Sequence, residues 1–320
     1  MTAKDNYYMK INFTKMHGLG NDFILVDCTK RKLGVKSSEL GELSRKLCRR
    51  RFSIGADQLL LLYPSRTADF RMRIFNADGS EVEMCGNGIR CLAKYIWSRR
   101  LSGKAILNIE TLAGIIRPQK KGKLVRVDMG EPIFEPEKIP VNLSLEFGVM
   151  SSETENSKLK TQNSKLLTPN SKLLTPNSKL LIDYPLRIED RKFKTTCVSM
   201  GNPHAVIVVD NVMDFPVTYY GPLLEMHEIF PKRTNVEFIE ILNPSEIKMR
   251  VWERGAGETM ACGTGASAVA VASSLKGLTK KNVTVHLTGG DLIIEWAEDN
   301  HVYMTGTAEE VFTGQINIKL

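Results

Sequence analysis

The chain has 320 residues, of which 42% are hydrophobic and 25% are charged, and its formal net charge is +8. These are ordinary globular values, so they exclude a wholly disordered chain, a collagen-like fibre and a membrane bundle. The length predicts two domains. The charge suits an anionic small substrate as well as a nucleic acid, and we expect neither a nucleic acid nor a membrane as partner.

In chain order, short runs of β-branched and aromatic residues between turn signals predict strands. They lie at 23–26, 58–62, 70–75, 125–129, 206–209, 236–241, 248–252 and 283–287. Apolar residues at helical spacing predict amphipathic helices over 38–50 and 87–99. A further helix is predicted over 264–275, with small residues on every side, and we expect it to be buried at a domain centre.

Between the two groups of strands lies a seven-residue repeat, NSKLLTP, within 156–181. It is not a coiled-coil heptad, because Pro169 and Pro176 would interrupt a helix every second turn. Too little apolar surface recurs to offset the entropy of ordering. The pattern therefore predicts a flexible, low-complexity insertion over 151–181.

A second repeat indicates an internal duplication. Residues 72–90 match residues 249–267 without a gap, and the match includes Cys-Gly-x-Gly in both. At the same offset Gln58 corresponds to Asn235, and at a similar offset Asn21 corresponds to Asn202. Three ordered anchors at nearly one spacing predict two structurally equivalent halves.

Cys85 and Cys262 occupy the same position in the two halves, each before a Gly-x-Gly that opens a predicted helix. The positive end of a helix favours an anion, so we expect the pKa of both thiols to fall and the glycine loops to hold a substrate carboxylate. Two thiols on opposite faces of one carbon suit racemisation or epimerisation. The alternative is a tight turn with a buried cysteine in each half.

Six motifs, spread from residue 13 to residue 268, carry a family resemblance. They are FTKMHGLGNDFILVD, GADQ, FNADGSEVEMCGNGIRC, MGNPHAV, TNVEF and ERGAGETMACGTGASA. In these the chain resembles the diaminopimelate epimerase family. The resemblance implies a cofactor-independent isomerase that interconverts LL- and meso-diaminopimelate for lysine and peptidoglycan biosynthesis, and a homodimer.

The implied fold is α+β, with two pseudo-symmetric domains that each wrap a mixed sheet or barrel around a central helix. The active site is expected in the cleft between them. We expect a first half over 10–130, a second over 131–305, and a final strand over 306–320 that returns to the first half.

The resemblance also implies roles for individual residues. Cys85 and Cys262 are the implied acid–base thiols, and His204 and Glu253 the groups that tune them. The loops expected to hold the reacting carboxylate are Gly86–Asn87 and Gly263–Thr264. The remaining substrate-binding side chains are expected to be Asn21, Gln58, Asn76, Asn202, Asn235, Glu253 and Arg254.

Two other functions stay open at this level. A proline racemase-like enzyme would share both cysteines, but it typically carries His where this chain has Asn87. A redox or binding protein could instead use the two thiols as a switch. The N-terminus lacks the apolar core of a signal peptide, and the six cysteines show no zinc-like spacing, so we expect no metal and a reducing, cytoplasmic location.

Overall fold

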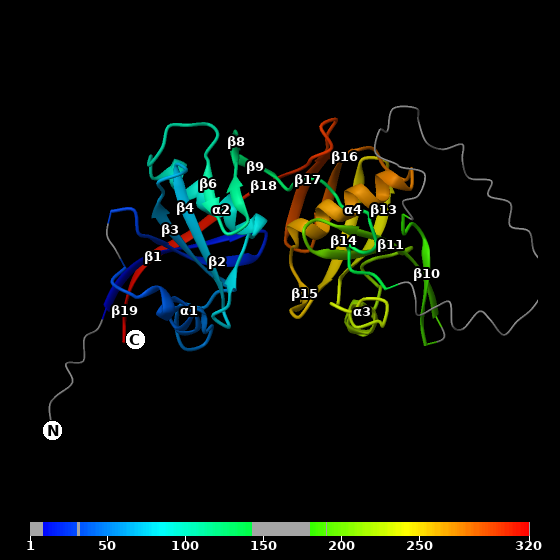
Figure 1. Cartoon of the computed structure of the whole chain (residues 1–320), viewed down its shortest axis with the longest axis horizontal. Helices are drawn as coiled ribbons and strands as arrows, with labels where there is room; N and C mark the ends of the chain where they lie inside the picture. Colours follow the sequence, from blue (N-terminus) through cyan, green and yellow to red (C-terminus); the bar gives the residue numbers. More distant parts are fainter. Residues whose placement is uncertain (1–8, 31–32, 143–179, 190, 320) are drawn as a thin grey trace, which may run out of the picture.

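The computed structural model describes residues 9–30, 33–142, 180–189 and 191–319. They form two lobes that lie side by side, each built on one mixed β-sheet with a few helices (Figure 1). The predicted α+β class with two similar domains is confirmed. Most of the predicted insertion, residues 151–179, lies outside the described residues.

The first lobe contains a sheet in the order β19-β1-β2-β3-β4-β6-β7, with β5 paired to β4. Its strands are β1 (Met9–Gly18), β2 (Asn21–Asp27), β3 (Gln58–Pro64), β4 (Phe70–Asn76), β5 (Glu81–Val82), β6 (Ile109–Thr111), β7 (Gly114–Ile116) and β19 (Glu309–Ile318). Its helices are the 3-10 turn η1 (Ser37–Glu39), α1 (Leu40–Cys48) and α2 (Gly86–Ser98).

The second lobe contains a sheet in the order β10-β11-β12-β13-β14-β16-β17-β18-β9-β8, with β15 paired to β14. Its strands are β8 (Gln119–Lys121), β9 (Leu124–Asp128), β10 (Tyr184–Ile188), β11 (Arg191–Ser199), β12 (Pro203–Val208), β13 (Asn235–Asn243), β14 (Glu246–Glu253), β15 (Gly257–Thr259), β16 (Asn282–Leu287), β17 (Gly290–Trp296) and β18 (Val302–Gly306). Its helices are α3 (Val217–Glu225) and α4 (Gly263–Leu275).

The strand register supports the duplication read from the sequence. In the first sheet β2 runs parallel to β3 and places Phe23 beside Gln58. In the second sheet β12 runs parallel to β13 and places His204 beside Asn235. The next strand is antiparallel in both sheets and pairs with a short partner, β5 or β15. The two halves therefore place equivalent residues at equivalent sites.

Helices α2 and α4 lie at the centres of the lobes, as predicted. The side chains of α4 are almost all small, and nearly every one is buried, so the strands can approach this helix from several sides. One continuous apolar core includes residues of both helices and of both sheets. The core therefore holds the two helix N-termini in a fixed relation to each other.

The structure corrects several expected boundaries. The strands β8 and β9, which we placed at the end of the first half, pair with the second sheet through β18. Leu181, which we placed in the insertion, is buried. Neither sheet closes on itself among the described strands, so the barrel alternative is not seen. Helix α3 went unpredicted because it contains both Gly221 and Pro222, which normally signal a turn.

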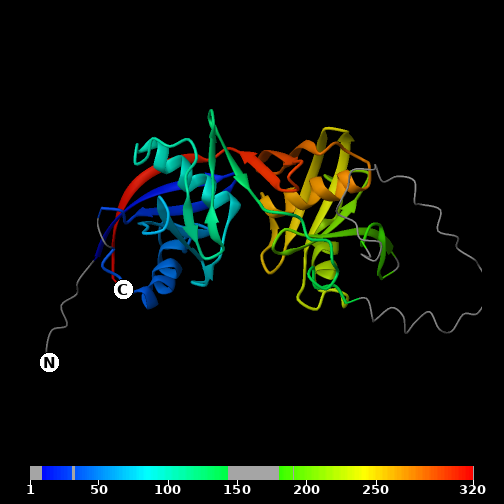
Figure 2. The ribbon, with the colours of Figure 1, turned by 45° about the horizontal axis from the view of Figure 1, so that its top comes forward.

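The C-terminal strand β19 crosses from the second lobe and pairs antiparallel with β1 over nearly its whole length (Figure 2). The chain therefore passes between the two sheets twice, once between β7 and β8 and once between β18 and β19. Two covalent crossings restrict how far the lobes can separate at the interface where the cysteines lie.

Candidate active site

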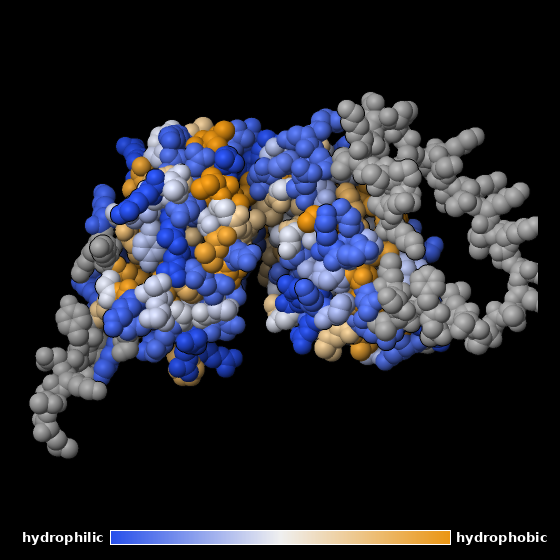
Figure 3. Space-filling model, viewed as in Figure 1, coloured by the Kyte–Doolittle hydropathy of each residue, from blue (hydrophilic) through white to orange (hydrophobic). Residues whose placement is uncertain are grey.

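A cavity of about 1740 Å³ opens between the lobes, where the space-filling view shows the molecule to be hollowed (Figure 3). All but two of the site residues predicted from the sequence line it, and the two exceptions are His204 and Asn235. The predicted residues are far apart in the chain and come from both halves. The structure therefore brings them together in one cleft.

Cys85 is the N-cap residue of α2. Its extended backbone lets the Sγ atom turn back toward the first turn, where it accepts a hydrogen bond from the backbone N–H of Gly88 at 3.4 Å. The same sulfur lies 3.8 Å from Oδ1 of Asn21, which also accepts from Nδ2 of Asn87 at 3.2 Å. The thiol is thus held between a helix end and an amide oxygen.

Cys262 is the N-cap residue of α4, with the same extended backbone. Its Sγ atom makes no hydrogen bond to the backbone of the helix and instead lies 3.5 Å from the hydroxyl of Thr264. The two cysteines therefore occupy equivalent positions but have different immediate partners.

The two cysteine loops abut each other. The Nδ2 atom of Asn87 donates to the carbonyl of Ala261 at 3.3 Å, which links the first loop directly to the second. Met304 lies against both loops, so a Cβ atom on either Gly86 or Gly263 would come within 2.9 Å of its side chain. Glycine at both positions lets the two helix ends approach one another and leaves their N–H groups open to an anion.

The expected fall in thiol pKa is wrong for this structure. Burial raises the pKa of Cys85, and the N–H group of Gly88 offsets only part of that rise. Burial also raises the pKa of Cys262 well above its ordinary value, and the carboxylates of Glu253 and Glu237 raise it further. Desolvation therefore outweighs the helix ends.

A charged network that the sequence analysis missed holds Asn21. Nδ2 of Asn21 donates to Asp57 at 2.9 Å, and Asp57 in turn is bound by Arg50 at 2.6 Å. Arg50 also donates two hydrogen bonds to Asp22, and Lys15 donates one to the same carboxylate at 2.7 Å. Asp57 belongs to the GADQ motif, so the motif pointed to it although its role was not assigned.

Two amide side chains that line the cavity in the first half, Gln58 and Asn76, contact each other. Nε2 of Gln58 donates to Oδ1 of Asn76 at 2.8 Å, across the β3–β4 pair. Oδ1 of Asn76 therefore accepts from the protein, while Oε1 of Gln58 is buried and has no protein partner among the described residues. Gln58 thus has an unused acceptor atom next to the cavity that it lines.

In the second half, Asn235 is committed to the protein. Its Nδ2 atom donates to the carbonyl of Pro203 at 2.8 Å, and its Oδ1 atom accepts from the backbone N–H of Arg254 at 2.9 Å. Asn235 therefore fixes the loop that presents Arg254 and Glu253 to the cavity. The Glu253 carboxylate accepts a hydrogen bond from Thr259.

His204 lies behind the cavity wall and is fully buried with Glu237. Nδ1 of His204 is 2.6 Å from Oε1 of Glu237, and Nε2 is 3.0 Å from Oδ1 of Asn202. Glu237 is a second residue that the sequence analysis did not assign, although it stands in the TNVEF motif.

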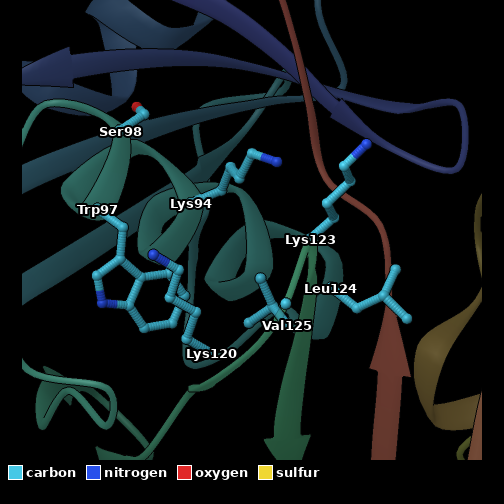
Figure 4. Close-up of a pocket in the computed structure, with 8 residues that line it drawn as sticks. Lys94, Trp97, Ser98, Lys120, Lys123, Leu124 and Val125 are labelled. Atoms are coloured by element: carbon cyan, nitrogen blue, oxygen red, sulfur yellow. The ribbon is translucent and has the colours of Figure 1, made fainter.

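Other features lie apart from the cleft. A smaller cavity of about 200 Å³ lies beside α2 and is lined by Lys94, Trp97, Lys120 and Lys123, among others (Figure 4). Within the described part of the chain, no three His, Cys, Asp or Glu side chains are grouped so as to hold a metal ion. None of the helices among the described residues is long and apolar enough to span a membrane.

Comparison with known proteins agrees with the geometry. The family profile described as diaminopimelate epimerase matches residues 13–135 and 196–311. Proteins named diaminopimelate epimerase from Acetivibrio thermocellus and Methanococcus maripaludis are each 49% identical over 314 residues. Both alignments cover 96% of this chain, and they cover 99% and 100% of the respective relatives.

Solved structures share the fold at low sequence identity. A phenazine biosynthesis protein of the PhzF family from Bacillus anthracis aligns with a TM-score of 0.65 at 17% identity and covers 97% of this chain and 99% of its own. A hydroxyproline epimerase from Agrobacterium vitis aligns with a TM-score of 0.63 at 13% identity and covers 100% of this chain and 94% of its own. The family profile spans most of the chain and the relatives match it almost end to end, so the chain belongs to the diaminopimelate epimerase family.

Proposed function

We propose that this protein is an isomerase that converts LL-diaminopimelate to meso-diaminopimelate in lysine biosynthesis, with Cys85 and Cys262 as the acid–base pair. The observation that carries the proposal is the placement of two cysteines as N-caps of equivalent helices whose loops abut in one cavity. Relatives named for this activity match the chain almost end to end, which supports the choice of substrate.

In the proposed reaction, one cysteine is a thiolate and the other a thiol when the substrate binds. The thiolate removes the proton from the carbon beside a carboxylate, and the electron pair of that C–H bond is delocalised into the carboxylate. The opposite thiol then donates its proton to the other face of the carbon. The configuration is inverted, the roles of the two sulfurs are exchanged, and no group besides the two thiols is needed to move protons.

The helix ends suit the charge that develops during this step. The carboxylate gains negative charge as the proton leaves, and the N–H groups of Gly86, Asn87, Gly263 and Thr264 at the starts of α2 and α4 would stabilise it. The abutting loops support this assignment, because they place both sets of donors at one side of the cavity.

The far end of the substrate carries a second amino group and a second carboxylate. Arg254 and Glu253 line the cavity with opposite charges, and Asn21, Gln58, Asn76 and Asn202 provide amides around it. We propose that these side chains grip the distal amino acid, so that a substrate with one charged end binds weakly. Asn235 acts indirectly, through the backbone of Arg254.

The test combines isotope incorporation with removal of each thiol. In D₂O, early product should carry deuterium at the inverted carbon while unreacted substrate stays largely unlabelled, because the donating thiol has exchanged with solvent. Cys85→Ala and Cys262→Ala should each lose about 10²–10⁴-fold in turnover, as expected for a positioned acid or base. Cys91→Ala is the matched control, since Cys91 is buried in α2 outside the cavity lining.

Three outcomes would contradict the proposal. Product that retains the substrate hydrogen in D₂O would rule out two bases. A near-normal rate in either thiol variant would rule out that cysteine as an acid–base group. Turnover of L-proline in place of LL-diaminopimelate would assign a different racemase.

We further propose that the protein works as a homodimer in the cytoplasm. Membership of the family supports the dimer, and the six free cysteines support a reducing compartment. Light scattering coupled to size-exclusion chromatography tests the first point, and a mass of one chain would refute it. Fractionation of the source cells tests the second.

A further inference from the structure

The two helix ends rest on different pairs of buried residues. Beneath α2, a Cβ atom on Gly88 would meet Leu60 at 3.3 Å and Phe23 at 3.4 Å. Beneath α4, a Cβ atom on Gly265 would meet Oε1 of Glu237 at 2.8 Å. By the strand register, Phe23 corresponds to His204, and the sequence offset pairs Leu60 with Glu237.

All four of these side chains are fully buried. An apolar pair in one half is therefore replaced by an ionisable pair in the other. Burying a carboxylate is costly unless it is compensated, so a pair of this kind needs a reason that packing does not supply.

A chain of hydrogen bonds leads from Glu237 to the thiol of Cys262. It runs from Glu237 to His204 at 2.6 Å, from His204 to Asn202 at 3.0 Å, and from Asn202 to Thr264 at 3.3 Å. The last step is the 3.5 Å contact between Thr264 and Cys262. In the first half the corresponding amide, Asn21, is bound to Asp57 instead, and no polar side chain stands at the positions of Phe23 and Leu60 beneath the helix.

The partners fix the direction of each bond. Asn202 directs its oxygen toward His204 and its Nδ2 atom toward Thr264. His204 therefore donates from Nε2, and a second proton is shared between its Nδ1 atom and Oε1 of Glu237, which lie 2.6 Å apart. Since the hydroxyl oxygen of Thr264 accepts from Asn202, its own proton points to the sulfur.

We propose that Glu237 is a positioning residue, whose bond to Nδ1 keeps the N–H group of His204 at Nε2, facing Asn202, and thereby aims the Thr264 hydroxyl at Cys262. Without that carboxyl group the ring can carry its proton on Nδ1 and face Asn202 with a bare nitrogen. The amide would turn to donate to that nitrogen and would present its oxygen to Thr264. The Thr264 proton would then go to Asn202 and leave the sulfur.

This inference rests on the proposed role of Cys262, so its test uses a readout that needs no substrate. The rate of alkylation of each cysteine by iodoacetamide is measured by mass spectrometry across a range of pH, where only the thiolate reacts. The ionisable groups that face Cys262 are Glu253 and Glu237. Loss of the Glu237 charge in Glu237→Gln would by itself lower the pKa of Cys262 and speed its alkylation, so slower alkylation identifies the lost hydrogen bond.

In Glu237→Gln, alkylation of Cys262 should slow by about tenfold, which is the effect of one hydrogen bond lost from a charged group. Alkylation of Cys85 in the same sample should be unchanged. Thr264→Val should also slow Cys262, and adding Glu237→Gln to it should cause no further slowing, because both changes remove the same bond.

A second variant controls for the possibility that Glu237→Gln simply misfolds. His204→Phe with Glu237→Leu installs the pair that already packs beneath α2, and it should fold and slow Cys262 to the same degree. Wild-type alkylation of Cys262 in either variant, equal slowing of Cys85, or additivity with Thr264→Val would overturn the inference. If the alkylation pattern holds but wild-type protein does not epimerise diaminopimelate, the proposed function fails and the role of Glu237 stands.

Discussion

Gly289 lies where the two lobes touch, against Leu19 and Met260. It stands in the two-residue turn between β16 and β17, and its N–H group donates to the carbonyl of Met260 at 2.8 Å. A Cβ atom there would lie 1.9 Å from the carbonyl oxygen of Leu19 and 3.1 Å from that of Met260. Both neighbours are backbone atoms, so no side-chain rotation can relieve the clash.

We expect Gly289→Ala to reduce turnover more than it reduces stability. Ordinary contact begins at 3.4 Å, so Leu19 and the new methyl group must separate by about 1.5 Å, and a misplacement of about 1 Å already costs about 10²-fold in rate. Leu19 is two residues before Asn21, and Met260 is two residues before Cys262, so the shift reaches both thiols. The overpacking itself should cost about 1–3 kcal/mol of unfolding free energy.

The assay is the initial rate of epimerisation, with the melting temperature measured on the same preparation. Gly103→Ala is the matched control, because a Cβ atom on Gly103 meets nothing within 4 Å. Turnover of Gly289→Ala within about twofold of wild type, or an equal loss in Gly103→Ala, would refute the reasoning that the lobe contact positions the thiols.

Three further changes test other parts of the structure. Burial raises the pKa of Asp22, but Arg50 and Lys15 outweigh it and hold the pKa well below its ordinary 3.8. Asp22→Asn should therefore lower the unfolding free energy by about 3 kcal/mol near neutral pH. In urea titrations, the difference between variant and wild type should shrink as the pH falls below 3.8. Hydrogen bonding to Asp128 raises the pKa of His301 above its ordinary 6.5. Wild type should therefore be more stable than His301→Gln below pH 6.5, and this advantage should decline as the pH rises past the raised pKa. Equal advantages at about pH 6 and about pH 9 would contradict this. Phe13→Ala should lower the unfolding free energy by about 3 kcal/mol. It should also speed hydrogen exchange in β19, because the ring of Phe13 packs against that of Phe312 in this strand, with centroids 5.9 Å apart. Unchanged exchange in β19 would show that the Phe13 ring does not stabilise the strand.

The local elements could be predicted because their signals are local. All eight predicted strands and the three predicted helices are present, since alternation and helical spacing of apolar residues reflect one buried face. The duplication was equally readable, because equivalent positions kept Cys-Gly-x-Gly and the amides that precede it. Helix α3 could not be read in the same way, because Gly221 and Pro222 normally signal a turn, and only the structure shows Gly221 packed against Trp252.

Residue types at fixed spacing were enough to predict the two matched cysteines, the helices that begin after them and the amides around them. The pKa values of the two thiols, in contrast, depend on the fold. The helix ends predicted a lowered thiol pKa, but burial raises it at both cysteines, and burial depends on what the whole chain packs around each atom. Likewise, the sequence contains Glu237 and His204 33 residues apart, and only the parallel pairing of β12 with β13 places them together beneath Cys262.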